Sequence, residues 1–384
     1  MTVLRVNPAS NLPDSPFEPL PDRERLALNE RSFRQTIAIE RKRTERSKEP
    51  FLLMLLETGN PQGAETNGRI LERMASALLS AGRETDVVGW YKDRVTVGVL
   101  FTGLVVKDRN SILSTILSRV KTILRDQLRF DQVDQVSISF HFFPDDWDRG
   151  DSGSPSNTVL YPDLSSIEKR RKPLLLAKRI VDIAGSSLAL ILFLPLFVVI
   201  ALAIKLSSKG PVLFRQTRVG QYGRHFTFLK FRSMYADNDH TIHKRYVTEF
   251  IARDAQGKPP KREHPGQYKL TDDKRITRVG RILRRTSMDE LPQFFNVLQG
   301  DMSLVGPRPA IPYELAAYQT WHRRRILEAK PGITGLWQVT GRSHVRFDEM
   351  VRMDLRYAKA WSPWLDFKIL LRTPLAVIRG TGAY

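Results

Sequence analysis

Two adjacent carboxylates, Asp289 and Glu290, stand among arginines in the segment LRRTSMDELPQFFNVLQGDMSLVGPRP. Arg284 lies just upstream, and Arg308 follows in a rigid Pro-Arg-Pro. Phosphoryl chemistry on a diphosphate needs such a set, because one carboxylate attacks phosphorus or holds Mg²⁺ while arginines neutralise the phosphate oxygens. We therefore take these four residues as candidates for a phosphoryl-transfer site.

The same carboxylates also have a plain structural interpretation. Ser287-Met-Asp-Glu290 has the spacing of a capping box, which predicts that a helix begins there. Two acids in a first turn are favoured by the helix dipole without any catalytic role. Adjacent residues do not share a helix face, but at a helix N-terminus both can reach one site in front of the first turn. Only the neighbouring arginines favour the chemical interpretation.

Two further segments combine cations with aromatic or glycine residues. GPVLFRQTRVGQYGRHFTFLKFRSM predicts two short strands with a glycine turn, and it contains Lys230 and Arg232. Such interleaving can bind single-stranded nucleic acid, and it is equally typical of a solvated strand face. KPGITGLWQVTGRS is a glycine-punctuated loop that offers backbone amides, Gln338 and Arg342 to a nucleotide. By itself this loop defines no function.

The composition narrows the choice of partners. The chain of 384 residues has a formal net charge of +20, which implies anionic partners: nucleic acid, phosphorylated substrates or acidic lipid. The absence of cysteine excludes disulfides, thiolate metal sites and cysteine nucleophiles. The cations crowd around one apolar run and through the C-terminal half, which favours lipid and phosphorylated substrates over nucleic acid.

That apolar run, Ile183 to Ile204, carries no charge. At 1.5 Å per residue it is long enough to cross a hydrocarbon core of about 30 Å, and buried core helices rarely extend so far without a polar face. Pro195 must kink or break the helix in mid-run. Both flanks are basic, so both should stay in the cytoplasm. We therefore expect a segment that enters the membrane and returns to the same face; a plain spanning helix with a tolerated proline is the alternative.

The N-terminal part has the periodicities of a separate small domain. The expected elements are a helix from Arg31, strand Phe51–Leu56, helix Ile70–Leu79, strands Asp86–Trp90 and Val95–Phe101, helix Ser111–Leu128 and strand Val136–Phe143. Their order is βαββαβ, the ferredoxin-like arrangement.

Four ordered segments, KRIVDIAGSSLALILFLP, FLKFRSM, SMDELPQFFNVLQGDMSLVGPRP and KPGITGLWQVTGR, closely resemble the bacterial sugar transferase family. These are monotopic phosphoglycosyl transferases that start exopolysaccharide and other glycan assembly. The resemblance runs from Leu174 to Tyr384. It implies transfer of a sugar 1-phosphate from a UDP-sugar to polyprenyl (undecaprenyl) phosphate, with release of UMP.

The resemblance also assigns roles to particular residues. Asp289 would be the nucleophile that carries a covalent phosphosugar and would hold Mg²⁺, and Glu290 would assist the acceptor. The phosphate and substrate contacts expected on this basis are Lys230, Arg232, Arg284, Arg308, Gln338 and Arg342. The implied location is the bacterial inner (cytoplasmic) membrane, with both termini on the cytoplasmic face. Anionic membrane lipid is an expected partner, nucleic acid is not, and a homo-oligomer is possible.

The N-terminal unit resembles a degenerate member of the GGDEF-type, nucleotidyl-cyclase-like fold. Its hairpin, Gly89-Trp90-Tyr91-Lys92-Asp93-Arg94, lacks the family's glycine and acidic pairs, so we expect no cyclase activity. A membrane-anchored nucleotide-signalling protein is nevertheless the alternative function.

The expected fold class is α/β (α+β), with five parts. These are a flexible tail at 1–30, a ferredoxin-like domain at 31–144, a linker at 145–173, a re-entrant membrane helix at 174–209, and a small, mostly helical catalytic domain with amphipathic interfacial helices at 210–384.

Overall fold

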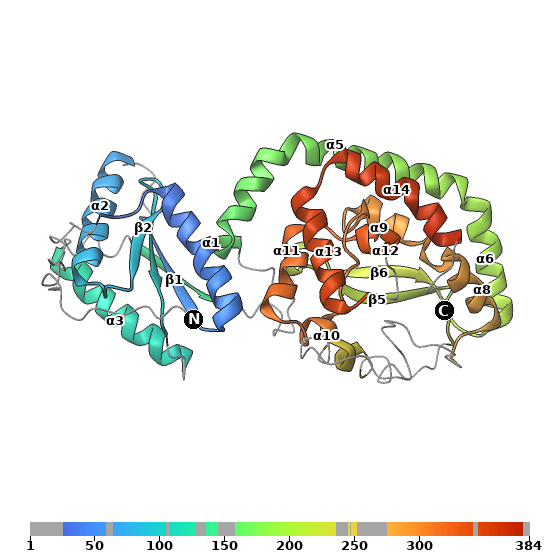
Figure 1. Cartoon of the computed structure of the whole chain (residues 1–384), viewed down its shortest axis with the longest axis horizontal. Helices are drawn as coiled ribbons and strands as arrows, with labels where there is room; N and C mark the ends of the chain where they lie inside the picture. The colour runs from blue at the N-terminus through green and yellow to red at the C-terminus, as the bar shows by residue number, and fades with distance from the viewer. Residues whose placement is uncertain are drawn as a thin grey trace, which may run out of the picture. The chain divides into compact units, whose positions relative to one another are not determined.

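The computed structural model describes residues 26–58, 64–104, 108–127, 136–144, 158–235, 245, 247–251, 275–340 and 345–378. Its elements are mixed α and β, as expected (Figure 1). The chain divides into two compact units, which are described one at a time. The first comprises 1–33 and 53–140; the second comprises 34–52 and 141–384.

The first unit is built on a four-stranded sheet whose order is β2-β3-β1-β4. Its elements are β1 (Phe51–Thr58), α2 (Ala64–Ala81), β2 (Val87–Lys92), β3 (Thr96–Phe101), α3 (Arg109–Gln127) and β4 (Val136–Phe143). This is the βαββαβ order that the periodicity predicts. The helices begin and end within a few residues of the predicted bounds, except that α2 begins earlier.

The burial pattern along each strand agrees with its central or edge position in the sheet. The first six residues of β1 are all buried, which suits an inner strand covered on both faces, whereas β4 is less buried and lies at the edge. Gly89 and Gly98 are paired across β2 and β3, and the ring of Phe33 lies against both. A Cβ at Gly98 would come within 2.3 Å of that ring, so glycine is required for this close packing.

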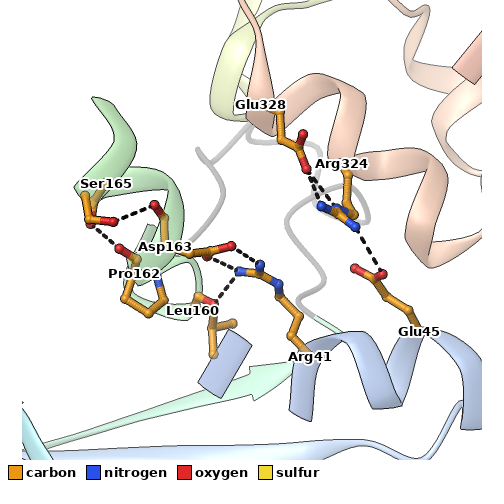
Figure 2. Close-up of polar contacts among 9 residues, drawn as sticks. Arg41, Glu45, Leu160, Pro162, Asp163, Ser165, Arg324 and Glu328 are labelled. Carbon is orange, nitrogen blue, oxygen red and sulfur yellow. Dashed lines mark hydrogen bonds and ion pairs between the residues drawn. The ribbon is translucent and has the colours of Figure 1, made fainter. Parts of the chain in front are cut away.

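Most of α1 (Glu30–Ser47), from Arg34 onward, belongs to the second unit, which the sequence did not indicate. Figure 2 shows why: Arg41, with 1% of its surface exposed, binds both oxygens of Asp163 at 2.9 and 2.7 Å and also the carbonyl of Leu160. Beside it, Arg324 contacts Glu45 at 3.7 Å and also pairs with Glu328. We call these five charged residues the α1 cluster.

The second unit is mostly helical around two small sheets (Figure 1). Its longer elements are α5 (Pro162–Leu192), α6 (Leu194–Ser207), β5 (Leu213–Val219), β6 (His225–Phe231), α8 (Arg278–Thr286), α9 (Gln293–Gln299), α13 (Phe347–Ala360) and α14 (Pro363–Ile378). The shorter ones are β7 (Ser303–Val305), α10 (Pro312–Leu315), α11 (Arg324–Glu328), β8 (Gly332–Thr334) and α12 (Leu336–Thr340), with 3-10 turns η1 (Thr158–Leu160), η2 (Gln221–Gly223), η3 (Met288–Glu290) and η4 (Thr320–Arg323).

The long helix α5 begins at Pro162, inside the range expected to be a linker, and continues through Pro173. It ends at Leu192, and α6 continues at an angle of 60° after the single residue Phe193. Pro195 occupies the first turn of α6, where its missing N–H can be tolerated, but it cannot continue the hydrogen bonding of α5. Among the described helices, none alone has the length and apolar composition to cross a bilayer; 170–192 and 194–207 reach both only as a bent pair.

Candidate active site

Lys230 is positioned by the alternation of strand β6. Strands β5 and β6 pair antiparallel through all seven residues, as the two-strand prediction requires. Phe228 and Lys230 share one face, and the Lys230 ammonium lies 5.6 Å from the centre of the Phe228 ring. Phe231 faces the other way and packs on Phe197 of α6, with ring centres 5.2 Å apart. The aromatic neighbours therefore hold the strand while the lysine points toward the carboxylates.

Lys230 brings the two candidate catalytic acids together. Its Nζ donates to Glu290 Oε1 at 2.7 Å and lies 3.7 Å from Asp289 Oδ2. Asp289 is 93% buried, whereas Glu290 is more accessible. Burying a carboxylate is costly unless an opposite charge compensates it, and Lys230 supplies that charge. We call these three residues the catalytic cluster.

The capping box predicted at Ser287 does not form. Ser287 instead ends α8 in a left-handed conformation, φ 57°, and its side chain makes no cap hydrogen bond. Asp289 and Glu290 lie in the 3-10 turn η3, and α9 begins only at Gln293, after Pro292. The reason is that the chain must turn sharply between two helices here. The turn places both acids between helices rather than on the side of one.

Arg284 reaches the site through a close approach of two backbones. Gly280 in α8 lies against Ser233 so tightly that a Cβ there would come within 1.9 Å of the Ser233 carbonyl. Thr277 caps α8 by accepting from the Gly280 N–H, and its own N–H bonds to Ser233. Arg284 Nε then donates to Ser233 Oγ at 2.9 Å. The guanidinium is thus held next to the strand that carries Lys230.

Arg232 has a different set of contacts from those expected of a phosphate ligand. It is buried, and its two terminal nitrogens donate to the carbonyls of Ser208 and Lys209 at 2.8 and 2.7 Å. These carbonyls follow the end of α6, where a cation is favoured by the helix dipole. The contacts tie the apolar helix to β6, and the role of Arg232 toward phosphate stays a prediction.

Arg308 and Gln338 follow the two strands of the parallel pair β7–β8. Parallel strands end at one edge, so the loops after them meet there. They meet at glycines: a Cβ on Gly335 would lie 2.4 Å from the Gly306 carbonyl. The Gln338 amide nitrogen donates to Ile333, and no described residue bonds to its buried oxygen. Arg342 lies outside the described residues.

Two buried arginines donate hydrogen bonds to the backbone of the Pro-Arg-Pro loop. Arg325 donates to the carbonyl of Arg308 at 2.9 Å, and Arg218 donates to that of Pro309 at the same distance. Burial, assisted by Glu314, raises the pKa of Tyr313 to about 12 against the opposing charges of Arg218 and Arg308. The Tyr313 phenol therefore stays protonated near this loop at neutral pH.

The far end of α9 is held by cations from elsewhere in the chain. Arg179 of α5 donates to the carbonyls of Val297 and Leu298 at 2.6 and 2.8 Å, and Lys330 donates to that of Gly300. These bonds satisfy carbonyls that a helix C-terminus leaves open. The helix α9, which follows the two candidate catalytic acids, is thus bonded directly to α5, the first helix of the apolar run.

The two carboxylates of the catalytic cluster have the ligand chemistry that suits Mg²⁺. The described residues contain no group of three or more histidine, aspartate and glutamate side chains placed to hold a metal. Asp289 and Glu290 nevertheless place carboxylate oxygens side by side next to Lys230. Mg²⁺ is commonly held by one or two carboxylates together with substrate phosphates, so this pair fits such an ion.

Sequence reasoning missed several residues of this arrangement. Ser233, Arg179 and Asn296 lie inside the recognised segments, but each acts through contacts with distant parts of the chain, which have no sequence signature. The glycines Gly280, Gly306 and Gly332 do give a signal, because a glycine without a turn function often marks a close approach of two backbones.

Residues 174–380 match the family described as bacterial sugar transferase. The galactosyl transferase CpsE of Streptococcus agalactiae is 44% identical over 215 residues, which are 54% of this chain and 44% of that protein. The UDP-glucose:undecaprenyl-phosphate glucose-1-phosphate transferase of Caulobacter vibrioides is 42% identical over 54% of this chain and 72% of that protein. The chain thus spans under half the length of the first of these relatives. A solved structure described as a DGC protein, from Thermotoga maritima, covers 32% of this chain and 86% of its own length at 16% identity, with a TM-score of 0.27, too low to carry an argument.

Proposed function

Since the chain belongs to the bacterial sugar transferase family, we propose that it transfers a sugar 1-phosphate from a UDP-sugar to polyprenyl phosphate and releases UMP. The observation that carries this proposal is the catalytic cluster: a nearly buried aspartate beside an accessible glutamate, both next to Lys230. The Caulobacter relative is named for this kind of reaction, with undecaprenyl phosphate as acceptor. The product would initiate exopolysaccharide or other glycan assembly.

The reaction proceeds in two displacements at one phosphorus atom. A carboxylate oxygen of Asp289 attacks the β-phosphorus of the UDP-sugar, and the bond from that phosphorus to the bridging oxygen breaks. UMP departs with the bridging oxygen, leaving the sugar phosphate as an acyl phosphate on Asp289. An oxygen of polyprenyl phosphate then attacks the same phosphorus, and the Asp289 carboxylate leaves unchanged.

The surrounding residues handle charge and the acceptor. Lys230 and Arg284 flank the acids and neutralise charge on the phosphates, with Arg308 presented by its rigid loop. Glu290, the more accessible acid, orients the acceptor phosphate or takes its proton. Mg²⁺, held by Asp289 when bound, would relieve the repulsion between the attacking carboxylate and the diphosphate.

A membrane-bound acceptor requires the site to lie at a membrane, and exposed apolar side chains support this. Of the fourteen residues of α6, only Ile200 and Ile204 are buried. Exposed apolar residues on α5, α6 and α14 include Leu188, Ile191, Leu192, Val198, Val199, Leu202, Trp364, Phe367, Leu371 and Ile378. A contiguous exposed apolar surface marks a membrane or protein contact.

The bend between α5 and α6 supports a re-entrant, monotopic arrangement with both flanks on the cytoplasmic face. The test uses single cysteines placed near Ser166 and Ser207 of the cysteine-free chain. Both should be protected from a membrane-impermeant reagent in intact cells and should react after lysis. Labelling of either one from outside would establish a true span. Pro195→Ala should straighten the helix and shift molecules toward that span, with loss of activity.

The function itself is tested with detergent-solubilised protein, polyprenyl phosphate and a panel of UDP-sugars. UMP should be released with at least one donor, and omission of the acceptor should leave a phosphosugar on Asp289 that intact-mass measurement detects. Release of free sugar phosphate or no release with any donor would contradict the proposal. A signalling function is not favoured, because the family match covers the part of the chain that carries the acids.

A further inference from the structure

We propose that Asn296 is a positioning residue of this reaction, whose side-chain amide fixes Lys230 at its distance from Asp289 and Glu290. The proposal rests on the proposed function of the catalytic cluster. Asn296 lies in α9, directly after the turn that carries the two acids, and it is completely buried.

Strand β6 has an edge whose backbone groups need a partner. The N–H of Arg232 bonds to the carbonyl of Val212, on the β5 side. In an antiparallel pair such bonds alternate along the strand, so Leu229 and Thr227 turn their N–H and C=O to the opposite side. The described part of the chain places no third strand beside β5 and β6. Buried backbone groups left without a partner would be costly.

The amide of Asn296 occupies this edge in place of a strand. Its Oδ1 accepts from the Leu229 N–H at 3.0 Å, and its Nδ2 donates to the Thr227 carbonyl at 2.7 Å. One amide thus supplies both the acceptor and the donor that a peptide unit of a neighbouring strand would supply. An aspartate of the same shape has no donor for the Thr227 carbonyl, and an apolar side chain has neither group.

The main chain of Asn296 is fixed as well as its side chain. Its carbonyl accepts from the N–H groups of Gly300, Asp301 and Met302 at 3.1, 3.1 and 3.2 Å. With both ends held, Asn296 makes a rigid connection between α9 and β6. The residue that follows Leu229 is Lys230, whose Nζ lies 2.7 Å from Glu290 and 3.7 Å from Asp289.

The connection through Asn296 determines where the Lys230 ammonium group lies relative to the negative charge that develops on the phosphate oxygens during the reaction. A displacement of about 1 Å in a catalytic group can cost roughly 100-fold in rate, because oriented charges act only at short range. Loss of the connection should therefore lower the turnover number, while contacts that bind the UDP-sugar elsewhere remain.

The experiment compares Asn296→Asp with Gln299→Glu, which makes the same change of charge at an exposed position of the same helix. Asn296→Asp should lower the kcat of UMP release about 100-fold and change the KM for UDP-sugar less than about threefold. Gln299→Glu should match the wild type.

A double-mutant cycle tests whether Asn296 acts through Lys230. In a Lys230→Met background, Asn296→Asp should reduce the remaining activity less than about threefold, since its target is already gone. An equal loss in both backgrounds would mean that Asn296 acts independently of Lys230, and the proposal would be overturned.

A second readout needs no substrate: the rate at which a water-soluble ester acetylates Lys230, followed by peptide mass spectrometry. Exposed Lys209 serves as the internal reference. Asn296→Asp should raise the Lys230 rate several-fold relative to Lys209, because Nζ is no longer held against the acids. The acetylation rate tests the role of Asn296 even if the wild type releases no UMP. Absence of UMP release would refute only the proposed function.

The remaining outcomes are also decisive. Unchanged acetylation together with unchanged turnover would refute the proposal. If Asn296→Asp does not fold, Asn296→Ser is measured in the same ways, since a hydroxyl keeps one of the two bonds. If neither variant folds, the role of Asn296 is to stabilise the fold and not to position Lys230, and the proposal is wrong.

Discussion

Two ion-pair clusters lie in the second unit, each with one more carboxylate than cations, and they differ in the kind of cation that they contain. In the α1 cluster, three carboxylates face two arginines, and the buried Arg41 uses both terminal nitrogens on Asp163 and the Leu160 carbonyl (Figure 2). In the catalytic cluster the cation is a lysine, Lys230, whose ammonium group lies beside both Glu290 and Asp289.

The comparison shows why one cluster suits structure and the other suits chemistry. Two-pronged arginine bonds fix both partners in one geometry, which stabilises the join between α1 and the start of α5. A lysine is a point charge on a flexible stem, so it imposes no such fixed geometry on the carboxylates beside it. The following predictions test this distinction, from the largest expected effect to the smallest.

The same exchange, aspartate to asparagine, should have opposite consequences in the two clusters. Asp289→Asn keeps the side-chain shape but removes the nucleophile, so UMP release should fall about 10⁴-fold with little change in melting temperature. Asp163→Asn should instead lower the free energy of unfolding by about 2 kcal/mol, because it leaves a buried arginine short of charge, with activity nearly unchanged. Near-normal turnover of Asp289→Asn would rule out the covalent mechanism at this residue.

Chelation should affect only the catalytic cluster. Excess EDTA should reduce UMP release roughly 1000-fold, because the repulsion between Asp289 and the diphosphate is then unrelieved, and added Mg²⁺ should restore it. The melting temperature should not change, since the carboxylates of the α1 cluster already have arginine partners. Full activity in EDTA would exclude a required divalent ion.

Removal of the central arginine should destabilise the α1 cluster. Arg41→Met leaves Asp163 and the Leu160 carbonyl without their buried donor, and should lower the free energy of unfolding by about 3 kcal/mol in denaturant titration. The control is Arg43→Met on the same helix, where the side chain is exposed and lies 3.7 Å from Glu40. That change should cost under about 0.5 kcal/mol. Equal losses would show that Arg41 is no more important than a surface residue.

Two carboxyl groups of the α1 cluster, Asp163 and Glu45, should change the stability of the protein in opposite directions as pH falls. Burial alone would raise the pKa of Asp163, but the bonds and charge of Arg41 lower it, so its stabilisation is present above the ordinary carboxyl range and is lost as pH falls through the lowered value. Burial raises the pKa of Glu45 against the opposing charges of Arg324 and Arg41. As pH falls, Glu45 is therefore protonated in the folded state before it is protonated in the unfolded state. The free energy of unfolding rises as pH falls from above the raised pKa of Glu45 toward the ordinary carboxyl pKa of 4.5.

Two variants separate these responses in unfolding titrations across the acid range. Glu45→Gln should remove the rise in stability, and Asp163→Asn should remove the loss of stability at lower pH. An unchanged pH profile in both variants would show that neither carboxyl controls acid stability.

Much of the chain could be predicted from local pattern. The strands β1 to β6 follow from alternation and apolar runs, and the order βαββαβ follows from their spacing. The uncharged run and its proline predicted a bent helix pair, and the bend occurs at Phe193, two residues before Pro195. The candidate catalytic acids were chosen from their motif, because residue types and their order can be read without any knowledge of distance.

The local sequence pattern could not predict which distant segments of the chain contact each other. The capping box at Ser287 was wrong, because the sharp turn from α8 to α9 overrides a local side-chain preference. The expected linker is partly helix, since Arg41 binds the start of α5 across more than a hundred residues. Sequence alone therefore determined which groups are present: the acids, the arginines, the apolar run and the strands. Only the tertiary structure decided that Lys230 meets Glu290 at 2.7 Å and that Asn296 connects α9 to β6, because such distances depend on backbone geometry that no short stretch of chain encodes.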